Sequence, residues 1–135
     1  MADLPAAVAD THALLFHAAG AAALGRRAAG HFDACERQQA LVYVPMAVIW
    51  EASLLARVGK VSLRRPIREF FGDLFSNPAF QPLDLGAEQL FLADELRFTR
   101  DPFDALIVAA ARSLELPLLT RDAQIRASGA VAVLW

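Results

Sequence analysis

Short apolar segments that favour strands alternate with helical segments along the whole chain. The clearest strand segment is residues 41–44, Leu-Val-Tyr-Val, which is β-branched and aromatic. Further strand segments are expected at residues 4–9, 81–85, 116–120 and 131–134. Strands separated by helices need crossover connections, which place parallel strands in one sheet and helices on both of its faces. The alternation therefore predicts an α/β fold with a short parallel sheet flanked by helices.

The size of the chain indicates one domain. At 135 residues it lies in the commonest range for a single hydrophobic core. Hydrophobic residues make up 56% of the sequence, and much of the excess is alanine, which favours helices more than it builds an aromatic core. We expect residues 1–135 to form one helix-rich domain.

Capping residues mark where the helices begin and end. Asp101 is suited to the N-cap of a helix, with Pro102 at its first position and Asp104 at its third. Pro45 should open a helix that carries Glu51 before Gly59 ends it. Other helices are expected from Thr11, over about residues 21–38, from Pro66 to Phe75, over residues 87–96, and after Asp122.

Four acidic residues are candidates for a metal site: Asp10, Glu51, Asp104 and Asp122. Most of them lie where strands end or helices begin, and such ends converge on one crevice in an α/β fold. Mg²⁺ and Mn²⁺ prefer oxygen ligands, and two such ions about 3.5–4 Å apart can hold a scissile phosphate and activate a water. Thr120 precedes Asp122 by two residues, so its hydroxyl could orient a carboxylate or a water. A nuclease is the leading interpretation.

Each acid also has a purely structural interpretation. Asp10, Asp101 and Asp122 can cap helices, and Asp104 can interact favourably with the first turn of its helix. Glu51 follows Ile49 and Trp50 in an apolar helix, where an inward carboxylate is costly without a cation; an outward one would need no explanation. Thr120 can be an ordinary strand residue. The aromatic residues Trp50, Phe103 and Trp135 are most simply core anchors.

Several other functions lack their signatures. Cys35 is the only cysteine, so neither an internal disulfide nor a cysteine-rich zinc site can form, and we expect a structural thiol. Neither a dinucleotide-binding nor a P-loop glycine motif is present. A phosphoacceptor receiver domain needs a late lysine, whereas the only lysine is Lys60. The histidines, His12, His17 and His31, lack the spacing of a helical zinc site, so we expect structural or surface roles.

Charge and hydropathy limit the partners. The formal charge of −2 provides no global attraction to nucleic acid, so such binding must be local. One segment concentrates the residues Arg57, Lys60, Arg64, Arg65 and Arg68, which either contact phosphates or form a solvated helix face. No window reaches the roughly 18 apolar residues of a membrane span, and no secretory leader pattern opens the chain. We expect a cytoplasmic protein without a membrane partner.

The four acidic segments together resemble those of the PIN-domain ribonucleases, in particular the toxins of bacterial type II toxin–antitoxin pairs of the VapC type. The similar segments are residues 10–15 (DTHALL), 48–51 (VIWE) with 59–61 (GKV), 100–104 (RDPFD), 118–122 (LLTRD) and the terminal 133–135 (VLW). The resemblance spans nearly the whole chain. It implies that Asp10, Glu51, Asp104 and Asp122 bind Mg²⁺ or Mn²⁺ and that the reaction is hydrolysis of RNA phosphodiester bonds.

The resemblance also implies two protein partners: a second copy of the chain in a homodimer, and an antitoxin segment laid over the helices near residues 57–75, covering the site. Large apolar side chains there exceed what one small core needs; they are Leu54, Leu55, Phe70, Phe71, Leu74 and Phe75. The alternative is that these side chains complete the core of one chain. Two other functions stay open: a catalytically degenerate PIN-like module that binds RNA or protein, and an unrelated α/β interaction domain whose acids are all caps.

Overall fold

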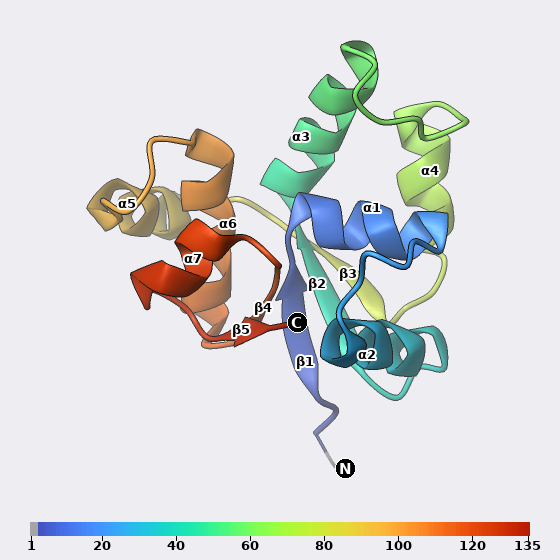
Figure 1. Ribbon diagram of the computed structural model, residues 1–135, viewed down its shortest axis with the longest axis horizontal. Coiled ribbons are helices and arrows are strands. Elements are labelled where there is room, and N and C mark those ends of the chain that lie inside the picture. Colours follow the sequence, from blue (N-terminus) through green and yellow to red (C-terminus); the bar gives the residue numbers. More distant parts are fainter. Residues whose placement is uncertain (1–2) are drawn as a thin grey trace.

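A five-stranded parallel sheet runs through the centre of the protein (Figure 1), as the computed structural model describes it over residues 3–135. The strands are β1 (Ala6–Ala9), β2 (Leu41–Pro45), β3 (Phe80–Leu83), β4 (Leu118–Leu119) and β5 (Val133–Leu134). Their order across the sheet is β3-β2-β1-β4-β5, and every neighbouring pair is parallel. The predicted α/β class with a short parallel sheet is confirmed.

Seven helices connect or follow the described strands, and they lie on both sides of the sheet. They are α1 (Thr11–Ala19), α2 (Arg26–Glu36), α3 (Met46–Arg57), α4 (Ile67–Leu74), α5 (Ala87–Glu95), α6 (Pro102–Leu114) and α7 (Ala123–Ser128). In Figure 1 α1 and α2 lie to the right of the sheet and α5, α6 and α7 to its left, with α3 and α4 towards the top. None of the helices within residues 3–135 is long and apolar enough to cross a membrane.

The helix boundaries follow the capping residues closely, with one clear difference. A helix over residues 21–38 was expected, but α2 begins only at Arg26. Gly20 ends α1 in the left-handed region with a φ of 66°, and Gly25 then serves as the N-cap of α2. The alanines between these two glycines favour a helix, but the left-handed conformation of Gly20 turns the chain at the end of α1.

The core consists of small and medium side chains from the central strands, packed against a few large ones from the helices. Fully buried residues include Val8, Val42, Val44, Leu118 and Leu119 from the sheet and Leu14, Phe32 and Ile107 from the helices. Phe103 and Trp135 pack against this core, as expected. Phe70 and Phe71 are buried within the chain, and Leu74 and Phe75 pack on the same core while only partly buried.

The expectation that Trp50 anchors the core is wrong. Its side chain is 50% exposed, and the Arg57 guanidinium lies 5.1 Å from the centroid of its ring. The buried residues of α3 are Ala47, Val48 and Ala52. Position 50 falls outside that stripe at helical periodicity, so the bulk of the tryptophan faces away from the core.

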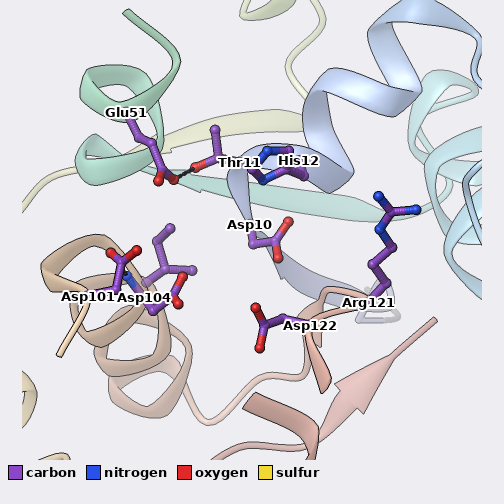
Figure 2. A pocket seen from close by; sticks show the side chains of 9 residues that line it. Asp10, Thr11, His12, Glu51, Asp101, Asp104, Arg121 and Asp122 are labelled. Atoms are coloured by element: carbon purple, nitrogen blue, oxygen red, sulfur yellow. Dashed lines mark hydrogen bonds between the residues drawn. The ribbon is translucent and has the colours of Figure 1, made fainter. Parts of the chain in front are cut away.

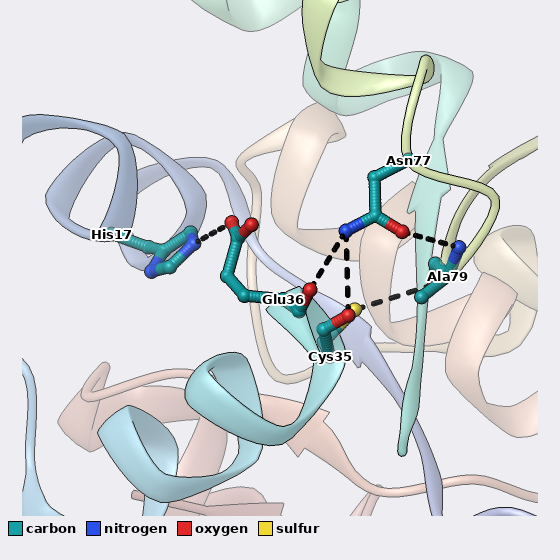
Figure 3. Close-up of polar contacts among 5 residues, drawn as sticks. All are labelled: His17, Cys35, Glu36, Asn77 and Ala79. Carbon is teal, nitrogen blue, oxygen red and sulfur yellow. Dashed lines mark hydrogen bonds and ion pairs between the residues drawn. The ribbon is translucent and has the colours of Figure 1, made fainter. Parts of the chain in front are cut away.

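Side-chain hydrogen bonds attach the end of α2 to the segment that leads into the edge strand β3 (Figure 3). The amide nitrogen of Asn77 donates to the carbonyl oxygens of Cys35 and Glu36, and its oxygen accepts from the Ala79 nitrogen at 3.0 Å. The Cys35 thiol donates to the Ala79 carbonyl at 3.3 Å, and burial raises its pKa to about 12. A neutral, buried thiol of this kind has the structural role that the sequence predicts.

The last residue of the chain packs against the start of α2. The carbonyl oxygen of Trp135 accepts from the Arg27 nitrogen at 2.9 Å and from the Ala28 nitrogen at 3.0 Å. It therefore satisfies two of the helix N–H groups that have no partner within the helix. A Cβ atom at residue 25 would lie 2.5 Å from that same oxygen, so only glycine allows this approach.

We predict that Gly25→Ala destabilises the protein by about 1–3 kcal/mol, because the added methyl group displaces Trp135 from the start of α2. Gly30→Ala is the matched control, since a Cβ at residue 30 has no atom within 4 Å. That substitution should stabilise the helix by about 0.5–1 kcal/mol. Urea unfolding of both variants measures the difference, and equal midpoints would contradict the packing described here.

Candidate active site

Three of the acidic side chains are fixed at the ends of β-strands or the starts of helices. Asp10 follows β1 and caps α1, where its Oδ1 accepts from the Ala13 nitrogen at 2.8 Å. Asp122 lies beyond β4 and caps α7, with Oδ1 accepting from the Ile125 nitrogen at 2.9 Å. Asp101 caps α6, and its Oδ1 accepts from the Phe103 and Asp104 nitrogens. All three caps were expected from the sequence.

These caps surround one cavity of about 360 Å³ (Figure 2). It is lined by Asp10, Thr11, His12, Glu51, Asp101, Asp104, Ile107, Arg121 and Asp122. The four acids singled out as metal ligands, which come from segments far apart in the sequence, thus face one space. Asp101 joins them from the start of α6.

Capping and facing the cavity are compatible in this structure. The backbone bonds of Asp10, Asp101 and Asp122 all use Oδ1, so the second carboxylate oxygen of each is not used by the cap. The two interpretations of these acids were set out as alternatives, yet the geometry satisfies both. A cap also holds the side chain in one orientation, which a preorganised site requires.

Glu51 faces inward from α3 towards the same cavity. The hydroxyl of the buried Thr11 donates a short hydrogen bond to its Oε1. This contact joins the start of α1 to the middle of α3 and orients the carboxylate. Thr11 was missed as a site residue, although its position directly after Asp10 placed it beside the candidate site.

Thr120 supports the site without lining the cavity. Its side chain is fully buried, and its Oγ1 accepts from the Asp122 nitrogen at 3.1 Å. Burial raises the pKa of the Asp10 carboxylate, and the neighbouring Thr120 hydroxyl opposes part of that rise. Thr120 therefore connects two of the four acids.

Of the three histidines, only His12 lines the cavity, and the basic segment over residues 57–68 lies outside it. His17 pairs with Glu36 at 2.8 Å and His31 bonds to the Leu41 carbonyl, so both have the structural roles expected. His12 lines the cavity, as does Arg121, and neither was predicted there. No side chain of residues 57–68 lines this cavity.

The carboxylates are crowded and poorly solvated. Burial, followed by repulsion from Asp101, Asp122, Glu51 and Asp10, raises the pKa of Asp104 to about 7. Burial also raises the pKa of Asp10 and of Glu51 above their ordinary values, against the hydrogen bonds that lower them. Within residues 3–135 none of these acids forms a salt bridge. A cluster of this kind is electrostatically suited to a divalent cation.

The donor chemistry fits Mg²⁺ or Mn²⁺. All candidate ligands are carboxylate oxygens, which these hard cations prefer over nitrogen or sulfur. Over residues 3–135 the side chains do not form a ready-made group of three or more His, Cys, Asp or Glu ligands. Mg²⁺ does not need one, because it usually keeps several waters and uses one or two carboxylates.

Comparison with known proteins links this arrangement to one family. The profile of the PIN domain family matches residues 7–130. No curated protein is similar enough in sequence to count as a match. Among solved structures, the chain is similar to that of VapBC2 from Rickettsia felis bound to a promoter DNA fragment. The TM-score is 0.65 and the sequence identity is 14%, with 95% of this chain and 96% of that chain covered.

Two further complexes have a similar fold. FitAcB from Neisseria gonorrhoeae has a TM-score of 0.63 and 17% identity, with 93% of this chain and 94% of that chain covered. A toxin–antitoxin complex from Klebsiella pneumoniae has a TM-score of 0.57 and 19% identity, with 86% of each chain covered. At such identities these structures support the fold that the family match indicates.

The raised pKa of Asp104 predicts a pH-dependent stability. With a folded-state pKa of about 7 against an ordinary 3.8, the folded protein holds the proton over a range where the unfolded chain has released it. The unfolding free energy should therefore fall as the pH rises from about 4 to about 7. Asp104→Asn removes this titration. In EDTA, the melting temperature of the variant should therefore increase relative to that of the wild type as the pH rises.

Asp33→Asn provides the control for this comparison, because Asp33 is an exposed acid on α2 outside the cavity. Its melting temperature should follow that of the wild type at every pH. If the melting temperature of Asp104→Asn also runs parallel to that of the wild type between about pH 4 and 8, the pKa of Asp104 is not raised in the folded protein.

Proposed function

The chain belongs to the PIN domain family, and on that premise we propose that it is a divalent-metal-dependent endoribonuclease and the toxin of a toxin–antitoxin pair. The observation that carries the proposal is the set of acids, Asp10, Glu51, Asp104 and Asp122, around one cavity, none of which forms a salt bridge within residues 3–135. A degenerate binding module would not need to keep four crowded carboxylates whose burial opposes their charge.

In this proposal Asp10, Glu51, Asp104 and Asp122 hold Mg²⁺ or Mn²⁺. The bound cation would lower the pKa of a nucleophilic water and offset the charge that develops on the scissile phosphate. Asp10 and Asp122 contribute from fixed caps, and Asp104 from the first turn of α6. At neutral pH Asp104 is partly protonated, so it releases a proton when a cation binds.

Thr120 and Asp101 act as supporting residues. Thr120 holds Asp10 and the Asp122 backbone together, which sets the spacing between two ligands. Asp101 fixes the first turn of α6 through the Phe103 and Asp104 nitrogens, and so sets the position of Asp104. Thr11 has the equivalent role for Glu51.

Two protein partners and a cytoplasmic location belong to the same proposal. The solved structures that this fold resembles include complexes of a toxin with its antitoxin. A hollow of about 390 Å³ between α1 and residues 61–70 offers an apolar seat for a segment of a cognate antitoxin. Its apolar lining includes Leu15, Phe16, Val61, Leu63 and Phe70. This hollow shares His12 with the acidic cavity, so a segment bound there could reach the acids.

The homodimer is supported by apolar side chains left uncovered around α5. Leu85, Leu90 and Phe91 are 40%, 49% and 60% exposed, and α5 has no buried residue. A helix without a buried face gains stability when its apolar residues meet another chain. The second copy would cover this surface, which is separate from the apolar hollow beside α1.

The metal site is tested with Asp10→Asn and Asp122→Asn. Asparagine keeps an oxygen for the cap and is as good an N-cap as aspartate, so the fold should survive. Loss of one ligand charge should reduce Mg²⁺-dependent cleavage of single-stranded RNA by about a hundredfold or more. Gel assays with Asp33→Asn as the control measure this, and full cleavage by either variant would refute the assignment.

The homodimer is tested by light scattering at micromolar concentrations, which should give about twice the chain mass of 14.6 kDa. Phe91→Glu places a charge on the surface around α5 and should give the single-chain mass. Val58→Glu is the matched control, because Val58 is 67% exposed but lies after α3. A single-chain mass for the wild type at all concentrations would exclude the dimer.

A further inference from the structure

Among the residues that the structure describes, Arg121 is the only arginine or lysine that lines the acidic cavity, and it does not pair with the acids there. Within residues 3–135 it forms no salt bridge and no side-chain hydrogen bond, although five carboxylates line the same space. Its guanidinium lies 4.6 Å from the centroid of the Phe16 ring on α1. Figure 2 shows it at one side of the cavity, extending away from Asp122.

Contact with Phe16 leaves the guanidinium ready to bind an anion. Arginine often lies against an aromatic ring by cation–π attraction and stacking. Its N–H donors then remain available and the side chain is held in place, so less conformational entropy is lost when a ligand binds. Phe16 is itself half-buried on α1, and its ring lies 6.1 Å from that of His12.

The position of Arg121 in the chain ties it to the candidate ligands. It lies between Thr120, which is fully buried, and Asp122, which caps α7. The backbone that sets the Asp122 carboxylate therefore also sets where the guanidinium emerges. A counter-charge for the acids would be expected to contact them, whereas this arginine is held to the side of the cavity.

We propose that Arg121 binds a phosphate of the RNA strand next to the one that is cleaved, with Phe16 as its platform. This inference rests on the proposed ribonuclease function. The acids would take the scissile group with the metal, and the planar guanidinium would take the neighbouring phosphate through two parallel N–H···O bonds. Arg121 is then a substrate-binding residue that fixes the register of the strand over the acids.

The test compares Arg121→Ala and Arg121→Lys in an Asp104→Asn background, in which cleavage is suppressed. Fluorescence anisotropy with a short labelled single-stranded RNA, in Mg²⁺ and at several salt concentrations, gives affinity and its salt dependence. Arg121→Ala should weaken binding roughly tenfold and reduce the salt slope by about 0.7, the value for one phosphate of a single strand. Arg121→Lys should restore the salt slope but not the full affinity. Lysine keeps the positive charge but cannot form the two parallel N–H···O bonds of the guanidinium.

Arg126→Ala is the matched control, since Arg126 is an exposed arginine on α7 that lines a different cavity beside Trp135. It should bind RNA as the background protein does. In the wild-type background Arg121→Ala should raise KM roughly tenfold with kcat nearly unchanged. If the wild type cleaves RNA and Arg121→Ala alters neither KM nor the salt slope, this inference is wrong and the ribonuclease proposal stands. If the wild type neither binds nor cleaves RNA, the ribonuclease proposal fails, and this inference fails with it.

Discussion

The parallel pairing of β1 with β4 is the constraint on which the rest of the site depends. Ala9 lies opposite Leu119, and the Asp10 nitrogen donates to the Leu119 carbonyl at 3.1 Å. Asp10 follows directly after this paired position in β1, and the segment from Thr120 to Asp122 follows it in β4. Both strands end at the same edge of the sheet, so their acids meet there although more than a hundred residues separate them.

Helix caps hold the carboxylates at this edge of the sheet in fixed positions. Each capping aspartate gives Oδ1 to the backbone of the next helix, while its side chain lines the cavity. The same bonds that stabilise α1, α6 and α7 therefore restrict the carboxylates to one orientation. The stability of the fold and the geometry of the site are thus determined by the same contacts.

The crowding of these carboxylates opposes folding at neutral pH, because burial and mutual repulsion both disfavour their charged forms. The protein offsets part of this cost with the hydroxyls of Thr11 and Thr120 and with backbone donors. A divalent cation would offset more. Arg121 does not, since its guanidinium lies over Phe16 and forms no ion pair with the acids. Within residues 3–135 the carboxylates around the cavity therefore have no salt-bridge partner.

The sequence by itself determined the order of the elements and most of their ends, because capping and turn preferences are local. The starts of α6, at Asp101 and Pro102, and of α7, at Asp122, were predicted correctly for that reason. Only the tertiary structure decided that Trp50 faces solvent, that Thr11 orients Glu51, and that His12 and Arg121 line the acidic cavity. These outcomes depend on how helices pack across the sheet, and a local pattern does not specify which distant side chain will occupy the facing position.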